Sequence, residues 1–173
     1  LKMNRQSLLE SKQLFISCVV PVYNEQDGVE NFVGKLADFI AQLTNHYEII
    51  IVDDGSKDDT ANVVESKLVS DKVKFIQFSR NFGKESALTA GLQYAEGDVI
   101  LLIDADFQHP FETIPEFLAK WAQGYDMAYG VRENRKDESF LKRRFTSVFY
   151  KLMGMMSEIS VPADAGDFRL LDR

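Results

Sequence analysis

Apolar, strand-like runs alternate with helix-like segments along this chain, and that alternation limits its fold more than any other feature. The runs are short and rich in valine and isoleucine, whereas the segments between them repeat apolar residues at helical spacing. Because parallel strands need a crossover helix between them, the pattern predicts an α/β fold with a mostly parallel sheet flanked by helices. Strands are predicted over 14–22, 48–52, 73–78, 99–103 and 127–130, and helices over 29–43, 84–95, 113–123 and 140–156.

The length and charge of the chain narrow the classes of function. A length of 173 residues predicts a single domain over 1–173. The formal net charge of -7 argues against a nucleic-acid partner, because nothing global would attract a polyphosphate backbone. Cys18 is the only cysteine, so no internal disulfide can form, and its apolar neighbours predict a buried residue in a reducing compartment. The last residues, 168–171, are still strand-like, which predicts a cut or an ordering limit there and not a natural end.

Polar residues follow three of the predicted strands at the point where each strand ends. In an open α/β sheet, ligands bind beyond the carboxyl ends of the strands, so these residues are expected to meet at one edge. A single polar strand end would be a loop, but three of them together predict a site. The clusters are Tyr23, Asn24 and Glu25 after the first strand, Asp53 and Asp54 after the second, and Asp104, Asp106 and Gln108 after the fourth.

Asp104 and Asp106 are separated by Ala105 directly after a buried run, which predicts a metal site. Alternate residues of an extended chain point the same way, so both carboxylates can face one ligand. Hard oxygen ligands suit Mg²⁺ or Mn²⁺, and such an ion would neutralise the charge of a departing diphosphate. The alternative for this short motif is a solvated turn at the end of a strand.

The segment 53–56, Asp-Asp-Gly-Ser, ends one strand and precedes a helix. Ser56 with Asp59 three residues later predicts a capping box for a helix that ends at Val69. Turn and cap chemistry alone would explain the glycine and the serine. Two adjacent carboxylates repel each other, however, and a nucleobase N–H or a ribose hydroxyl would relieve this, with Asn24 and Glu25 on the other side of the nucleoside.

Four sequence motifs follow one another along the chain: Pro-Val-Tyr-Asn-Glu (21–25), Asp-Asp-Gly-Ser (53–56), Asn-Phe-Gly-Lys (81–84) and Asp-Ala-Asp-Phe-Gln-His-Pro (104–110). In sequence, order and spacing they resemble family 2 glycosyltransferases of the GT-A fold. Two longer stretches, Ser-Arg-Asn-Phe-Gly-Lys-Glu (79–85) and Asp-Ala-Gly-Asp-Phe-Arg-Leu-Leu (164–171), look most like the polyprenyl-phosphate glycosyltransferases. That group includes bactoprenol glucosyltransferases and is related to dolichol-phosphate mannose synthase.

The resemblance implies roles for the residues that match the family's motifs. At the donor end, it implies that Pro21, Tyr23, Glu25 and Asp53 hold the nucleoside, with Asp53 at the base. It implies that Asp104, Asp106 and Gln108 bind the metal and the diphosphate, and that Arg132 meets phosphate.

At the acceptor end, the resemblance implies that Asp167 is the proposed catalytic base and that Arg169 contacts the acceptor phosphate, while Asp164 competes with Asp167 for the base role. Lys84 either meets a phosphate near a helix N-terminus or only belongs to a turn that starts the helix.

The stretch 132–151 is rich in arginine and lysine although the chain is acidic overall. Aromatic and aliphatic residues interleave with these cations over 140–156, which is typical of a basic amphipathic helix on an anionic membrane surface. The alternative is a helix that packs on the core with a solvated basic face. The resemblance implies further helices and two transmembrane segments beyond this sequence, a place on the cytoplasmic face of a membrane, and leaves a homo-oligomer open.

The function implied is transfer of a hexose from a nucleoside diphosphate sugar to a polyprenyl phosphate, with inversion at the anomeric carbon. UDP-glucose is the favoured donor and GDP-mannose the alternative. The acceptor phosphate is largely anionic near pH 7, because its second pKa is about 6, so Asp167 is expected to orient Arg169 or the acceptor. Two alternatives are a transferase that acts on a saccharide or protein hydroxyl and a non-catalytic sugar-nucleotide-binding module.

Overall fold

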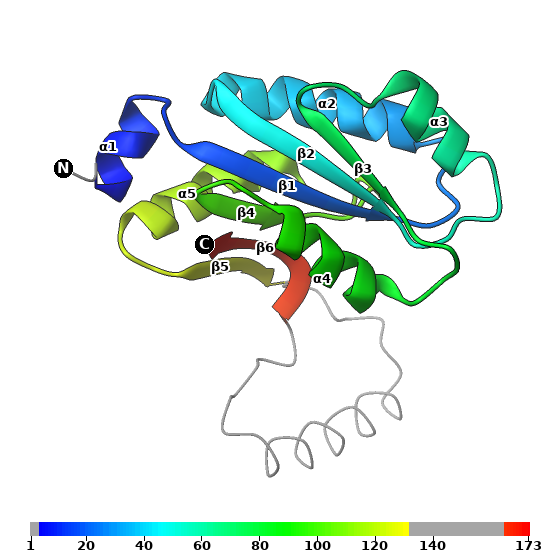
Figure 1. The fold of residues 1–173 in the computed structure, drawn as a ribbon. Helices are drawn as coiled ribbons and strands as arrows, with labels where there is room; N and C mark the ends of the chain where they lie inside the picture. Colours follow the sequence, from blue (N-terminus) through cyan, green and yellow to red (C-terminus); the bar gives the residue numbers. More distant parts are fainter. Residues whose placement is uncertain (1–3, 132–164) are drawn as a thin grey trace, which may run out of the picture. The chain divides into compact units, whose positions relative to one another are not determined.

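The computed structural model describes residues 4–131 and 165–173, and within them a six-stranded sheet has the order β3-β2-β1-β4-β6-β5 (Figure 1). The strands β1 to β4 are parallel, and β6 pairs antiparallel with β4. The mostly parallel α/β sheet is therefore confirmed. The elements are α1 (Arg5–Glu10), β1 (Phe15–Val22), α2 (Val29–Leu43), β2 (His46–Asp53), α3 (Thr60–Lys67), β3 (Val73–Gln77), α4 (Lys84–Tyr94), β4 (Val99–Leu102), η1 (Phe111–Thr113), α5 (Ile114–Ala122), β5 (Met127–Val131) and β6 (Ala165–Asp172).

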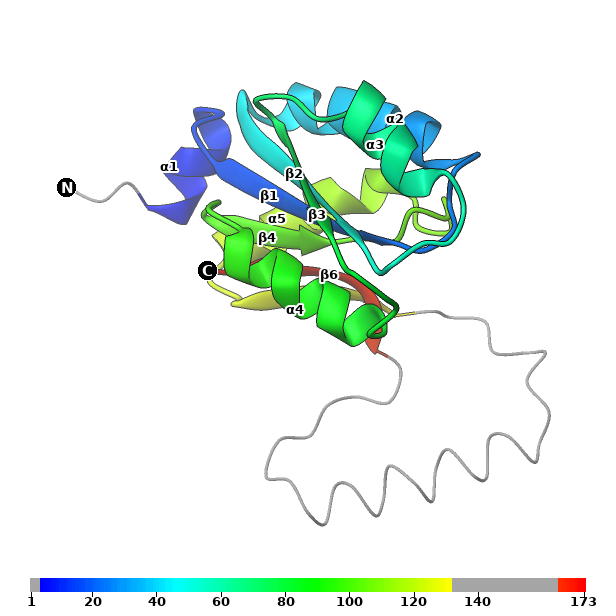
Figure 2. The same cartoon turned by 45° about the vertical axis from the view of Figure 1, so that its right-hand side comes forward.

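Successive residues of β1 face two different apolar cores, one on each side of the sheet. Cys18 and Val20 pack into the core that α2, α3 and α5 cover, whereas Val19 packs with α4 on the opposite face (Figure 2). This alternation follows from the two-residue period of a strand. Strands buried on both faces read as continuous apolar runs, which is why the sequence marks them clearly. Burial also raises the pKa of the Cys18 thiol, which agrees with a structural residue and not with a nucleophile.

The helix α1 lies outside the predicted elements. It is six residues long and has no buried residue, so it carries no apolar periodicity that could reveal it. Asn4 caps it by accepting a hydrogen bond from the backbone N–H of Ser7 at 2.7 Å. Arg5 connects it to the end of the chain through ion pairs of 2.9 Å with Asp126 and 2.8 Å with Asp172. Long-range ion pairs of this kind leave no local trace in the sequence.

The predicted capping box of α3 is wrong, although the helix itself is confirmed. Asp59 occupies the N-cap position and its side chain makes no capping hydrogen bond. Asp58 instead accepts a hydrogen bond from the backbone N–H of Thr60 at 3.1 Å. Ser56 is turned away from the helix and donates to Asp53, so its role belongs to the strand end that precedes it.

The chain divides into two compact units, one formed by Leu1–Ala128 with Asp167–Arg173 and the other by Tyr129–Gly166. Most of the second unit lies outside the described residues, and with it the predictions for Arg132, Asp164 and the helix over 140–156. The single domain over 1–173 stays a prediction. In the two described ranges, every helix is too short or too polar to cross a bilayer.

A buried carboxylate connects three strands at the edge of the sheet opposite the strand ends of interest. Glu48 on β2 accepts hydrogen bonds from the Ser17 hydroxyl at 2.5 Å and from the backbone N–H of Glu96 at 2.8 Å. Lys74 on β3 forms an ion pair with it at 2.7 Å. Burial alone would raise the pKa of Glu48, but these donors hold the pKa below its ordinary value of 4.5.

We expect Glu48→Gln to lower the free energy of unfolding by about 2 kcal/mol at pH 7, because it removes a buried, hydrogen-bonded charge. The lowered pKa means that the carboxylate stabilises the fold above pH 4.5 and loses this effect as the pH falls through the folded-state pKa. Urea unfolding from pH 7 to pH 3 should therefore show the difference between variant and wild type shrinking in acid. Glu30→Gln, at an exposed ion pair with Lys67, is the matched control and should change stability by less than about 1 kcal/mol.

Candidate active site

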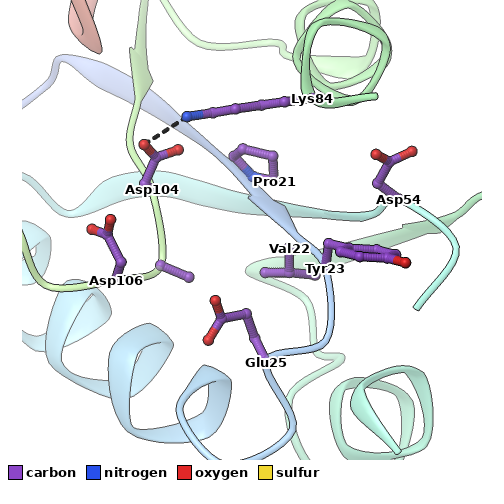
Figure 3. A pocket seen from close by; sticks show the side chains of 9 residues that line it. Pro21, Val22, Tyr23, Glu25, Asp54, Lys84, Asp104 and Asp106 are labelled. Carbon is purple, nitrogen blue, oxygen red and sulfur yellow. Dashed lines mark hydrogen bonds and ion pairs between the residues drawn. The ribbon is translucent and has the colours of Figure 1, made fainter. Parts of the chain in front are cut away.

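The polar strand ends meet in one pocket at the carboxyl edge of the sheet, as the sequence predicted (Figure 3). The hydrogen bonds between the strands place the ends of β1, β2 and β4 close together. Val22 pairs with Asp53, and the backbone N–H of Ile103 donates to Val19 at 3.1 Å. Nearly every described lining residue belongs to the predicted set. The lining residues are Pro21, Val22, Tyr23, Glu25, Asp54, Lys84, Asp104, Ala105 and Asp106.

Val22 is the one described lining residue that the sequence did not single out. It lies between Pro21 and Tyr23, so contiguity with the motif was the available signal. Its side chain is buried and apolar, which explains why chemical reasoning passed over it. The residue contributes apolar surface to the pocket and its side chain offers no polar group to a ligand.

The acid pair lies just beyond the end of β4. Asp104 forms an ion pair with Lys84 at 2.7 Å, and Asp106 is exposed to solvent. Phe107 has φ 57°, a left-handed conformation that is uncommon for a bulky residue. This turn brings the backbone N–H of Gln108 to 3.0 Å from Asp106 Oδ1. The loop therefore holds the Asp106 carboxylate in place while leaving its second oxygen for a ligand.

Glu25 adds a third carboxylate to the same side of the pocket, beside Asp104 and Asp106 (Figure 3). Its backbone N–H donates to the Thr60 hydroxyl at 2.8 Å, which connects the loop after β1 to the start of α3. Burial raises the pKa of Glu25, and the negative charges of Asp106 and Asp58 raise it further. The raised pKa therefore reflects burial first and the neighbouring carboxylates second, and a cation would offset the second cause.

Asp53 is fully buried behind the pocket and is not among its described lining residues. Ser56 donates to Asp53 Oδ1 from both its backbone N–H, at 3.0 Å, and its hydroxyl. Among the described residues, Asp53 Oδ2 is buried without a hydrogen-bond partner. A buried acceptor of this kind is costly unless a donor reaches it, and the role of Asp53 at the base stays a prediction.

Asp54 lines the pocket, but its carboxylate is occupied by the protein. Its oxygens accept hydrogen bonds from the backbone N–H of Phe82 at 2.7 Å and of Gly83 at 3.0 Å. The sequence predicts that a nucleoside relieves the repulsion between Asp53 and Asp54. In the structure, Ser56 already donates to Asp53 and the loop 80–84 donates to Asp54. Asp54 therefore positions that loop, and nucleotide binding by its side chain stays a prediction.

Asn24 and Gln108 are predicted ligands that are not among the described lining residues of the pocket. Asn24 has φ 55° and its side chain accepts a hydrogen bond from the backbone N–H of Lys57 at 2.8 Å. Its own N–H donates to the Ser56 hydroxyl at 2.9 Å, so Asn24 ties two strand ends together. Binding of a donor sugar by Asn24 and of a metal by Gln108 stay predictions.

The strand β6 lies beside the end of β4 and near the loop 104–110 that follows it, here called the metal loop. Arg169 is half-buried and pairs with Leu102, the last residue of β4. Phe168 stacks on His109 with ring centroids 4.9 Å apart, so His109 is a packing residue of the loop that follows Asp106. The backbone of Asp167 lies in β6, and its side chain lies outside what the structure describes.

Comparison with known proteins shows the family. The sequence pattern of glycosyl transferase family 2 matches residues 17–173. An uncharacterised glycosyltransferase of Bacillus subtilis is 44% identical over 164 residues, which are 94% of this chain and 51% of that protein. A prophage bactoprenol glucosyl transferase homolog of Escherichia coli is 42% identical over 159 residues, which are 91% of this chain and 52% of that protein. The chain thus spans about half the length of these curated relatives.

Solved structures show the same fold at low sequence identity. Mannosyl-3-phosphoglycerate synthase from Rubrobacter xylanophilus has a TM-score of 0.68 at 18% identity, covering 97% of this chain and 56% of that one. Glucosyl-3-phosphoglycerate synthase from Mycobacterium tuberculosis, crystallised with Mn²⁺, UDP-glucose and phosphoglyceric acid, has a TM-score of 0.66 at 18% identity, covering 99% and 61%. With the family match over nearly its whole length and this GT-A architecture, the chain belongs to glycosyl transferase family 2.

Proposed function

We propose that this chain is the catalytic domain of an inverting transferase that moves a hexose, preferably glucose, from a nucleoside diphosphate sugar to a polyprenyl phosphate. One observation carries the proposal: Asp104, Asp106, Glu25 and Lys84 meet in one pocket at the carboxyl edge of a GT-A sheet. Relatives about 40% identical are named bactoprenol glucosyl transferases, which supports glucose and a lipid phosphate.

The nucleoside is proposed to bind at the Tyr23 end of the pocket. Tyr23 is exposed and can stack on a base, and Asp53 Oδ2 is a buried acceptor suited to a base N–H. A uracil ring offers one N–H between two carbonyls, which suits a single acceptor. UDP-glucose is therefore the favoured donor, and GDP-mannose is the alternative.

A divalent ion, Mg²⁺ or Mn²⁺, is proposed to bind at Asp104 and Asp106, with Gln108 as a third ligand. The donor set fits, because carboxylate and amide oxygens suit hard cations and Glu25 adds negative charge nearby. Among the described residues, no three side chains of His, Cys, Asp or Glu are grouped to hold a metal by themselves. The remaining ligands would come from water and the donor's diphosphate, whose charge the ion would neutralise as the diphosphate departs from the sugar.

The acceptor is proposed to approach from the β6 side of the pocket. Arg169 lies beside the end of β4, where it is suited to contact an acceptor phosphate. A phosphate monoester is largely dianionic near pH 7, since its second pKa is about 6, so it attacks without losing a proton. We therefore assign Asp167 to orienting Arg169 or the acceptor, with Asp164 as the alternative, and Arg132 to the diphosphate.

The full-length protein is proposed to be membrane-associated, with the acidic pocket on the cytoplasmic side where nucleotide sugars are made. The basic segment 140–156 is proposed to lie on the membrane surface and the transmembrane part to lie in the other half of the protein. This chain spans only about half the length of these relatives, which leaves room for such a part. A homo-oligomer remains a further prediction.

The proposal is tested by incubating the protein with radiolabelled UDP-glucose, Mn²⁺ and a short polyprenyl phosphate, followed by extraction into organic solvent. We expect label in the organic phase, and none when the uncharged polyprenol replaces its phosphate. Label transferred only to added saccharides or protein would contradict the lipid acceptor. No consumption of UDP-glucose or GDP-mannose under any condition would favour a non-catalytic binding module.

A further inference from the structure

The carboxylate that is expected to bind the metal already has a cationic partner within the protein. Lys84 Nζ lies 2.7 Å from Asp104 Oδ2, and the two side chains are 39% and 22% exposed. Figure 3 shows the lysine side chain extending across the pocket from α4 to reach Asp104 at the far side. Lys84 is the only basic residue among the described residues that line the pocket.

This ion pair is held in place by the loop that delivers the lysine. Lys84 is the first residue of α4, and the preceding Gly83 has φ 94°, which turns the chain into the helix. Asp54 fixes the turn by accepting hydrogen bonds from the backbone N–H of Phe82 and Gly83. The ammonium position therefore depends on a second strand end and not only on a flexible side chain.

The Lys84 ammonium and the proposed metal would compete for the carboxylate of Asp104. A divalent ion bound at Asp104 Oδ2 would lie within a few ångström of the ammonium, and the two cations would repel each other. A further anion in the pocket would stabilise the two cations together. The diphosphate of the donor is such an anion, and it would bring more negative charge than the metal alone can neutralise.

We propose that Lys84 is an exchangeable counter-ion of Asp104, which suppresses metal binding until the donor's diphosphate arrives to take up the ammonium. The inference rests on the proposed function, since it requires the metal site and the nucleotide donor. It makes metal and donor bind cooperatively, because each removes an obstacle for the other. The metal alone and the diphosphate alone would then each bind weakly, and the two together would bind tightly.

The test measures Mn²⁺ binding by electron paramagnetic resonance in the wild type, Lys84→Met, Lys84→Arg and Lys35→Met, each with and without UDP. We expect UDP to tighten Mn²⁺ binding to the wild type about tenfold or more. In Lys84→Met, Mn²⁺ alone should bind about fivefold more tightly, and the effect of UDP should fall several-fold. Lys84→Arg keeps a cation and should resemble the wild type.

Lys35→Met is the matched control for charge, because Lys35 lies near the metal loop, against the ring of Phe107, without pairing with Asp104. If Lys35→Met tightens Mn²⁺ binding as much as Lys84→Met does, the effect is one of general charge and the exchange is wrong. Unchanged or weaker Mn²⁺ binding in Lys84→Met also overturns it. If Mn²⁺ does not bind to the wild type even with UDP, the metal site of the proposed function fails as well, which distinguishes the two failures.

Discussion

Replacing Asp106 with asparagine is expected to slow glycosyl transfer at least about a hundredfold, even with Mg²⁺ or Mn²⁺ in excess. The substitution removes the charge that a divalent ion needs. It keeps a side-chain oxygen that can still accept the 3.0 Å hydrogen bond from the backbone N–H of Gln108. Loss of activity in this variant would therefore report on the charge of Asp106 and not on the shape of its loop.

The measurement is a pair of assays on the purified variant: the rate of transfer from labelled UDP-glucose, and UDP binding by calorimetry with and without Mn²⁺. The variant should lose the part of UDP binding that depends on Mn²⁺. Glu112→Gln is the matched control, because Glu112 is exposed just beyond the same loop and the net charge changes equally. Transfer by Asp106→Asn within a few-fold of the control would contradict the metal assignment.

Gly55→Ala is expected to be the most damaging single change to the fold around the site. A Cβ at this position would lie 2.3 Å from the carbonyl carbon of Arg80 and 2.6 Å from its Cα, and Gly55 has φ 68°. Backbone atoms cannot move aside as a side-chain end can, so the loop 80–84 must shift. The strain and the overpacking together should cost about 2–5 kcal/mol and lower Tm by roughly 10 °C.

Two other glycines separate the causes. Gly83→Ala tests the backbone strain alone, because φ is 94° there but a Cβ would meet nothing within 4 Å. Its cost should be about 1–3 kcal/mol, because φ 94° with ψ 152° is a conformation that essentially only glycine adopts. Gly34 is exposed in α2, and a Cβ there would meet nothing within 4 Å. Gly34→Ala should therefore stabilise the protein by about 0.5–1 kcal/mol, because alanine loses less conformational entropy in a helix than glycine. If thermal unfolding shows Gly55→Ala no worse than Gly83→Ala, close packing of the two loops is not what Gly55 provides.

Gly55→Ala should also weaken UDP binding in the presence of Mn²⁺, measured at temperatures where the variant is fully folded. The shifted loop carries Lys84 toward or away from Asp104, and the Asp54 hydrogen bonds to Phe82 and Gly83 must change with it. Calorimetry well below Tm measures this directly. Normal ligand binding in a destabilised variant would show that the site tolerates movement of the loop.

Much of the architecture was readable from short-range patterns. The strands β1 and β2 are buried on both faces, so their apolar runs stand out, and α2 repeats its buried residues at helical spacing over its whole length. Chain order alone then placed Glu25, Asp104 and Asp106 at one edge, because parallel strands in such a sheet end on the same side. The pocket confirms that grouping.

Local reasoning was wrong where a polar side chain had several partners within reach. Ser56 was predicted to cap α3, but it bonds Asp53 and Asn24, the second of which lies 32 residues away in the chain. The helix α1 went unnoticed because it has no buried residue, and its anchor Arg5 pairs with residues more than a hundred positions away. Spacing rules describe only neighbours along one helix or strand, so such partners are invisible to them.

The sequence by itself determined the α/β class, the order of most elements and the edge of the sheet that carries the site. Its motifs also indicated the protein family. Those features follow from periodicity and from the direction of parallel strands, which depend on a few neighbouring residues. Only the tertiary structure decided that Asp53 Oδ2 is buried without a hydrogen-bond partner among the described residues. It also decided that Asp54 holds the loop 80–84 and that Lys84 occupies Asp104. These choices join residues 20 to 29 positions apart, and they depend on strand register and on loop packing that no local pattern encodes.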